Sequence, residues 1–278
     1  MTAVMTKPGL TQPRVPELKV TQARVVLSEL TKFRTLRSTK WTLAAAVVLM
    51  IGVGALLSAV QASQYHSAGG VPNPNVVHPI ATSLQGAMFA VVAFGVLGVL
   101  LMSGEYATGM IRASLTAVPR RLPVLWAKLA VFASVIFAVS LVTSFISFYV
   151  GQAILSTHHL SLSITAPGAV RSVIGAALYL TVAGLTGVAL GALFRNTAAG
   201  ISVFAGVFFV LPPLFMLLPT SIANHVSQYL PSNAGEVVWG GARQLNYSLA
   251  PWTGFALLCG YAAVIIGFAA WRLHRTDA

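Results

Sequence analysis

The chain has 278 residues, of which 56% are hydrophobic and only 8% are charged, with 17 Lys and Arg against 5 Asp and Glu. Soluble domains carry about 25% charged residues, so this composition excludes an ordinary soluble globular protein. A basic surplus would suggest nucleic-acid binding in a soluble protein, but here the basic residues flank apolar runs, as in the positive-inside pattern of membrane proteins, so no nucleic-acid partner is expected.

The first 40 residues precede any long apolar run. Residues 1–16 contain three prolines and few large apolar side chains, which predicts a flexible tail. Residues 17–40 have the pattern of an amphipathic interfacial helix, with Leu27 and Phe33 on its apolar face and Glu29 and Lys32 on its polar face. Such a basic helix lies in the headgroup layer against anionic lipid. The alternative is that its apolar stripe packs on neighbouring protein.

Long windows without Asp, Glu, Lys or Arg follow, and each can hold a membrane span of about 20 residues. The first window is interrupted by a loop rich in Gly and Pro, including Gly69, Gly70 and Pro72, which divides it into two spans. We therefore predict an all-α integral membrane protein whose six-span domain covers residues 41–278. The predicted spans are at about 41–60, 80–102, 124–151, 171–194, 197–218 and 251–271.

The segment from Ser103 to Lys128, between the second and third spans, has mixed charge. Gly109 permits a sharp turn, residues 110–117 can form a short helix, and Pro119 and Pro123 end it before the third span. A compact loop of this kind suits docking of another protein. The alternative is a plain connector with basic flanks.

Small and hydroxyl residues recur in the third and fourth spans. In the third span they share one face: Ser140, Thr143, Ser144 and Ser147. In the fourth span they are glycines: Gly184, Gly187 and Gly191. Close helix packing is one interpretation of these residues, and a polar surface facing a substrate pathway is the other.

The segment 219–250 is too apolar for a free loop and is divided by Pro219, Pro231, Gly240 and Gly241. This pattern predicts one or two short helices at the outer leaflet, with a disordered loop as the alternative.

Basic residues distinguish the two sides of the membrane. Fifteen of the seventeen lie in the N-terminal arm or in segments on its side, whereas only Arg171 and Arg243 lie on the other side. The positive-inside rule then places both termini in the cytoplasm.

Several catalytic and binding motifs are missing from the sequence. No lysine follows a glycine, so there is no phosphate-binding loop for ATP. There is no His-Glu-x-x-His motif, and the pair His158-His159 is interpreted as part of a solvated loop, so no metal site is expected. No ionisable residue is expected in the interior of a span, away from its ends, which disfavours an ion-driven carrier.

The loop after the second span nevertheless carries a recognisable order of residues. Glu105-Tyr106-x-x-Gly109-x-Ile111-Arg112, followed by Leu115, Pro119-Arg120-Arg121 and Lys128, resembles the corresponding loop of type-2 permeases of ATP-binding-cassette transporters. Ser28-Glu29-x-x-Lys32 before the first span and residues 229–235, Tyr-Leu-Pro-Ser-Asn-Ala-Gly, fit the same family, particularly its actinobacterial members.

The resemblance implies a half-channel in the bacterial plasma membrane that forms a homodimer, or pairs with a related permease, and binds a separate ATPase subunit. ATP and Mg²⁺ would bind to that partner, so no cofactor is expected on this chain. In this family the pre-membrane helix and a cytoplasmic coupling helix contact the ATPase, and short outer helices line the exit. The implied coupling residues are Glu105, Tyr106, Gly109, Met110, Ile111, Arg112 and Arg121.

An exporter permease accounts for the missing phosphate loop, the apolar spans and the mixed-charge loop together. Two other classes stay open at this point: a non-transporting membrane subunit for assembly or signalling, and a membrane-embedded enzyme. Co-purification with an ATPase would distinguish the exporter permease from both.

Overall fold

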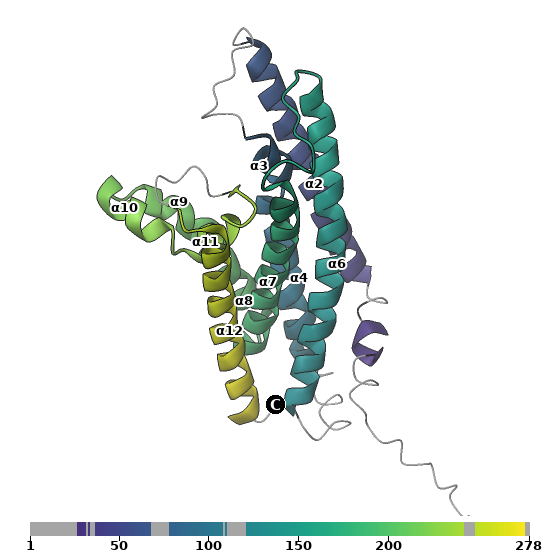
Figure 1. Cartoon of the computed structure of the whole chain (residues 1–278). Helices are drawn as coiled ribbons and strands as arrows, with labels where there is room; N and C mark the ends of the chain where they lie inside the picture. Colours follow the sequence, from purple (N-terminus) through teal and green to yellow (C-terminus); the bar gives the residue numbers. More distant parts are fainter. Residues whose placement is uncertain are drawn as a thin grey trace, which may run out of the picture.

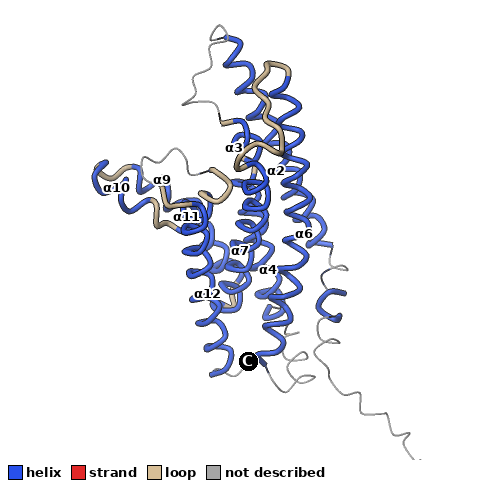
Figure 2. Tube along the Cα trace, viewed as in Figure 1, coloured by secondary structure: helices blue, strands red, loops and turns tan. Residues whose placement is uncertain are grey.

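The computed structural model describes residues 27–31, 33, 37–67, 78–107, 109, 121–241 and 248–275. Its labelled elements are α2 (Arg37–Ser67), α3 (Pro79–Leu84), α4 (Ala87–Ala107), α6 (Arg121–Ser156), α7 (Ala169–Phe194), α8 (Thr197–Ala205), the π-helix η1 (Gly206–Val210), α9 (Leu211–Met216), α10 (Thr220–Ser227), α11 (Pro231–Glu236) and α12 (Pro251–Arg275). Figure 2 shows the helices joined by loops, and the described residues contain no strand.

Six helical segments are long and apolar enough to cross a membrane, which confirms the predicted number. They are Ser38–Gln64, Pro79–Ala107, Pro123–Ser156, Ala169–Phe194, Thr197–Phe215 and Pro251–Arg275. Several extend beyond the predicted bounds, because a charged residue ends an apolar window without ending the helix that contains it. Helix α6 also begins before Pro123, so the prediction that Pro123 precedes this helix is wrong. Proline is tolerated in a first helical turn, where its missing N–H would have no partner.

The second span is divided into α3 and α4 rather than being continuous. The break lies at Gln85 and Gly86, where the backbone of Gly86 comes so close to the carbonyl of Met50 in α2 that a Cβ atom there would overlap it. Only glycine permits this approach.

Helix α7 is the centre of the bundle and packs against α4, α6 and α12 (Figure 1). Its contact with α4 is the most extensive between any two described elements. Glycines meet along it, since a Cβ atom on Gly187 would overlap the backbone of Gly95, and one on Gly98 would overlap that of Gly184. The close helix approach predicted from the glycines of the fourth span is therefore confirmed.

The fifth span consists of α8, η1 and α9. The Asn196 side chain caps α8 by accepting a hydrogen bond of 3.0 Å from the N–H of Ala199. Pro212 and Pro213 follow the π-helix, and since neither has an N–H to donate, they interrupt the regular α-helical hydrogen-bond pattern here.

Two short helices, α10 and α11, precede the last span. This agrees with the prediction of one or two short helices between residues 219 and 250, of which 242–247 lie outside the described residues. Pro231 lies in the first turn of α11, where its fixed φ suits helix initiation. Helix α11 packs mainly on α12, and a Cβ atom on Gly235 would touch both Tyr179 of α7 and Leu258 of α12.

Candidate functional site

The described basic side chains gather at one end of the bundle, where α4, α7 and α12 end and α2, α6 and α8 begin (Figure 1). They are Lys40, Lys128, Arg195, Arg272 and Arg275. We call this the basic end. Arg171 lies near the start of α7, at the opposite end.

Three charged side chains meet inside the basic end. The ammonium group of Lys128 in α6 donates hydrogen bonds to Glu29 Oε2 at 2.6 Å and to Glu105 Oε1 at 2.9 Å. Lys128 is 1% exposed, Glu29 5% and Glu105 8%. We call Glu29, Glu105 and Lys128 the charge cluster. It joins the pre-membrane segment, the end of α4 and the start of α6.

An aromatic contact runs beside the charge cluster. The rings of Phe33 and Phe132 meet edge to face with centroids 6.1 Å apart. Phe33 follows Glu29 by four residues and Phe132 follows Lys128 by four, and residues four apart lie on the same face of a helix. The pre-membrane segment, which is helical over residues 27–31, is therefore attached to α6 by two successive contacts.

These contacts correct the predicted faces of the pre-membrane segment. Glu29, predicted on a polar face, is buried with Phe33, whereas Leu27, predicted on the apolar face, is 60% exposed. The reason is the counter-charge of Lys128, which makes the Glu29 face the one that packs on protein. Of the two interpretations offered for this segment, packing on neighbouring protein is observed for Phe33. Lys32 and most of residues 17–40 lie outside the described residues.

The charge cluster also places two ionisable residues within membrane-spanning helices. Glu105 and Lys128 both lie within helices that can cross a membrane, close to their ends. Ionisable groups in such positions have to pair with one another. Removing one partner of a buried pair generally costs about 3–5 kcal/mol, because the remaining charge loses its compensation. This cluster is thus suited to holding segments together, and the described residues contain no group of acidic, His or Cys side chains that could bind a metal.

The chain leaves α4 in a defined direction beside this cluster. The guanidinium carbon of Arg195 lies 5.2 Å from the ring centroid of Tyr106, which is a cation–π contact. Gly109 has a φ of +70°, and its N–H donates a hydrogen bond of 3.2 Å to the carbonyl of Tyr106. The predicted turn at Gly109 is therefore present. Residues 110–120, with the predicted coupling helix, lie outside the described residues.

The structure brings together some of the predicted coupling residues and leaves others untested. Glu105 joins Glu29 in the charge cluster, with Tyr106 next to it in sequence. The Glu105 carboxylate binds Lys128 inside the chain, and its role in coupling stays a prediction. Arg121 is the first residue of α6. The rest lie outside the described residues: Met110, Ile111 and Arg112.

The hydroxyl face of the third span points into the bundle. All four side chains are buried: Ser140, Thr143, Ser144 and Ser147. Ser147 donates a hydrogen bond of 2.7 Å to the carbonyl of Ser83 in α3, and Thr143 donates one of 2.7 Å to Val139 in its own helix. Within this chain, these residues have the arrangement expected for close helix packing.

Lys128 has a larger structural role than was predicted from the sequence, where it was noted only as one of fifteen basic residues on one side and as part of the family-like loop pattern. Its signal was its position among apolar residues of the third span, as Leu-Trp-Ala-Lys-Leu-Ala. A lysine in such a run requires an acidic partner, and the chain has only five acidic residues to supply one.

One acidic side chain is partly buried near the opposite end. Glu236, the last residue of α11, lies 3.5 Å from the hydroxyl of Tyr179 in α7, measured to Glu236 Oε1. Burial raises the pKa of the Glu236 carboxyl to about 7, although the hydrogen bond from Tyr179 acts in the lowering direction.

A scan against models of known protein families finds no match to this chain, and a search of curated proteins finds none either. Its function has to be inferred from its own residues and their arrangement.

Proposed function

We propose that this chain is the membrane-spanning permease subunit of an ATP-binding-cassette exporter in the bacterial plasma membrane. Two copies, or one copy and a related permease, would enclose the pathway, because a single bundle of six spans is small for that purpose. A separate ATPase subunit would bind ATP and Mg²⁺ and drive transport. The observation that carries this proposal is the charge cluster at the basic end.

The charge cluster connects the two segments that the resemblance assigns to ATPase contact. Glu29 precedes Lys128 by 99 residues and Glu105 precedes it by 23. One buried ammonium group therefore attaches both the pre-membrane segment and the base of the loop after α4 to the third span. A partner that docks on either segment would act directly on a membrane-spanning helix.

The arrangement of charge around this end supports the same proposal. Under the positive-inside rule the basic end faces the cytoplasm, where ATP is available. The sequence has no Gly-Lys pair for a phosphate-binding loop, so the energy source would belong to another polypeptide. The turn at Gly109 lies at the start of the proposed docking loop.

The test is co-expression of the full chain with the ATP-binding-cassette ATPase encoded nearest to it, followed by a pull-down and an ATPase assay. If Arg112 belongs to a buried charge pair across the interface, Arg112→Ala should weaken association with the ATPase more than tenfold. Loss of one partner of such a pair typically lowers the binding free energy by about 2–5 kcal/mol. Arg243→Ala, in the predicted outer segment, is the matched control and should leave association unchanged. Membrane levels of the variants have to be equal.

The outcomes separate the proposal from its alternatives. An assembly subunit or a membrane-embedded enzyme would purify without an ATPase and be insensitive to Arg112→Ala. Specific ATP hydrolysis by the purified chain alone would also overturn the proposal.

A further inference from the structure

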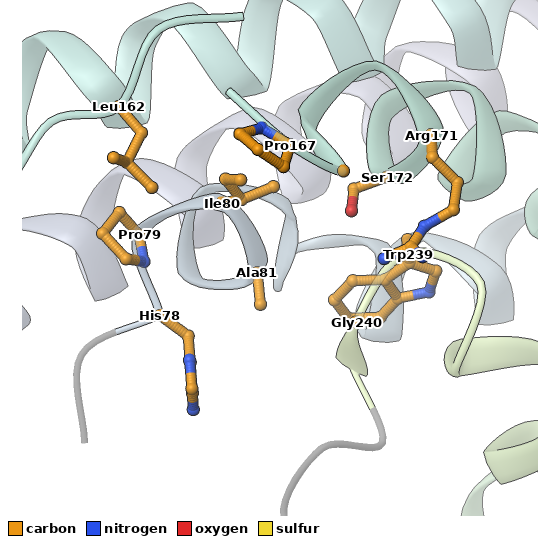
Figure 3. A pocket seen from close by; sticks show the side chains of 11 residues that line it. His78, Pro79, Ile80, Ala81, Leu162, Pro167, Arg171, Ser172, Trp239 and Gly240 are labelled. Carbon is orange, nitrogen blue, oxygen red and sulfur yellow. The ribbon is translucent and has the colours of Figure 1, made fainter. Parts of the chain in front are cut away.

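A pocket lies between the C-terminal part of α2, helix α3 and the chain at residues 240–241, at the end of the bundle opposite the basic end. It encloses about 320 Å³, within the range of about 300–1,000 Å³ for small-molecule sites. Figure 3 shows a neighbouring pocket, which shares His78, Ala81 and Gly240 with it. In that view the His78 and Ala81 side chains point away from Leu162, which lines only the neighbouring pocket.

Two rows of polar side chains line this pocket from different helices. Gln61 and Gln64 of α2 are three residues apart, so they lie on one face of that helix. His78, Thr82 and Gln85 are four and three residues apart, and they form a second row along α3 from its N-cap to its C-cap. The pocket thus combines side-chain amides, a hydroxyl and an imidazole from two separate parts of the chain.

Several of these groups are available to a ligand. The side chains of Gln64, His78 and Gln85 are each at least partly exposed, and none makes a hydrogen bond to another described residue. The Thr82 hydroxyl donates a hydrogen bond of 3.0 Å to the carbonyl of His78, so its oxygen can still accept one. A side-chain amide has two N–H donors and an accepting oxygen. The pocket therefore offers donors and acceptors side by side.

The pocket is polar without being charged. No Asp, Glu, Lys or Arg is among the described residues that line it. A charged ligand would lose hydration here without meeting a counter-charge, which is unfavourable. Leu57, Val60 and Ala81 give the pocket an apolar side. The complementary ligand is neutral, both donates and accepts hydrogen bonds, and has an apolar face.

A sugar ring has these three properties. Each of its hydroxyls donates one hydrogen bond and can accept two, and it rotates to suit its partner. The ring faces carry C–H groups, which can pack on the side formed by Leu57, Val60 and Ala81. Two neighbouring hydroxyls can bind one side-chain amide, with one hydroxyl donating to its oxygen and the other accepting from its N–H.

We propose that this pocket binds the hydroxyl groups of a neutral sugar, either as a free saccharide or as the head group of a glycolipid. Gln64, His78 and Gln85 form the hydrogen bonds. Leu56 and Val60 are exposed on α2 beside the pocket and would contact the alkyl chains of a glycolipid. Binding here is a property of the chain alone and does not depend on the proposed transport function.

The test is saturation-transfer-difference NMR on the full-length chain in octaethylene glycol dodecyl ether, because maltoside and glucoside detergents would themselves compete. One arm titrates glucose, galactose and mannose, with tetrahydropyran-2-methanol as the analogue that lacks the ring hydroxyls. The other arm titrates the hexyl glycosides of the same sugars, with hexanol as the analogue that lacks the sugar. Saturable binding of at least one sugar is expected, and neither analogue should bind. Equal affinity in the two arms identifies a free saccharide, and tighter binding of the hexyl glycoside identifies a glycolipid head group.

Two substitutions connect the binding to this pocket. Gln85→Leu removes the amide at similar volume and should weaken binding about tenfold, which corresponds to the loss of one or two hydrogen bonds. His78→Phe keeps a ring without the nitrogens and should weaken binding about fivefold. The matched controls are Gln228→Leu, at the C-cap of the short helix α10, and His274→Phe, exposed at the basic end. Both controls should bind like the unaltered chain.

The proposal would be overturned if none of the sugars or glycosides binds saturably, or if the two analogues bind as tightly as the sugars. Unchanged affinity in both Gln85→Leu and His78→Phe would also overturn it. If Gln85→Leu does not yield a monodisperse protein, Gln64→Leu replaces it, because Gln64 is exposed near the end of α2 and tolerates the change.

Discussion

Lys128 shows how one side chain can organise an end of a membrane protein. Its ammonium group has three N–H donors, and two of them bind carboxylates that come from distant parts of the chain. Because all three groups are buried, the cluster stays stable only while it is complete. The cation and its two anions therefore form one structural unit.

Lys128→Met should destabilise the folded chain by about 3–5 kcal/mol, since it leaves the carboxyl groups of Glu29 and Glu105 buried without their cation. The measurement is thermal stability in detergent, followed by fluorescence-detected gel filtration. Lys40→Met is the matched control, because Lys40 is exposed and should tolerate the change. The triple variant Lys128→Met, Glu29→Gln, Glu105→Gln should recover part of the loss. Equal stability of Lys128→Met and Lys40→Met would show that the charge cluster contributes nothing.

The raised pKa of Glu236 predicts a dependence of stability on pH. Burial raises the pKa of this carboxyl to about 7 from about 4.5 in the unfolded chain, so the folded state binds its proton more tightly. The contribution of Glu236 to the free energy of unfolding is therefore fully present below pH 4.5 and is lost as the pH rises to 7. The total loss is about 3 kcal/mol. Glu236→Gln should remove this dependence and raise the melting temperature at pH 8.

The control for this pH series is Glu17→Gln, which removes a carboxyl from the N-terminal arm and should keep the pH profile of the unaltered chain. If the stability of Glu236→Gln falls as steeply between pH 4.5 and 7 as that of the unaltered chain, another group is responsible for the pH dependence.

At the scale of elements, the α4–α7 contact should be the part of the bundle least tolerant of added side-chain volume. Gly187→Ala places a methyl group where the backbone of Gly95 lies, and overpacking of this kind typically destabilises by about 1–3 kcal/mol. Gly260→Ala in α12 meets open space and is the matched control. The comparison requires melting temperatures of both variants in the same detergent, and a Gly187→Ala variant as stable as Gly260→Ala would contradict the observed packing.

The spans could be predicted from the sequence because the cost of charge in lipid leaves long windows without ionisable residues. Helix bounds could be predicted less accurately than the number of spans. The apolar windows show only where charged residues lie. The break at Gly86 depends instead on contact with the backbone of α2, which is more than 30 residues earlier in the sequence. Helix α6 extends to Ser156, beyond the predicted span, and near this end Gln152 accepts a hydrogen bond from the N–H of Leu162 in the following loop.

The charge cluster could be predicted only in part. Glu29 and Glu105 were identified by resemblance, but helical periodicity placed Glu29 on a polar face, because nothing local indicates a buried partner 99 residues away. Arg171, at the opposite end, was recognised only as an exception to the charge asymmetry.

For the whole molecule, the charge asymmetry predicts which end faces outward. After replacement of the one native cysteine, Cys259, a cysteine at the exposed Ser163 should react with a membrane-impermeant maleimide added to intact cells. Cysteines at Ala117 and Thr276 should react only after permeabilisation, because fifteen of the seventeen basic residues lie on their side. Labelling of residue 117 in intact cells would reverse the orientation.

Helix α6 has a mechanical consequence. Lys128 and Gln152 lie about 36 Å apart along its axis, at a rise of about 1.5 Å per residue. The Lys128 side chain binds the pre-membrane segment and the end of α4, and the Gln152 side chain binds Pro79 and Leu162. An α-helix is stiff along its axis, so α6 connects these two sets of contacts rigidly. A displacement of α6 along its axis at the basic end should therefore also shift the contacts of Gln152 with Pro79 and Leu162 at the other end of the helix.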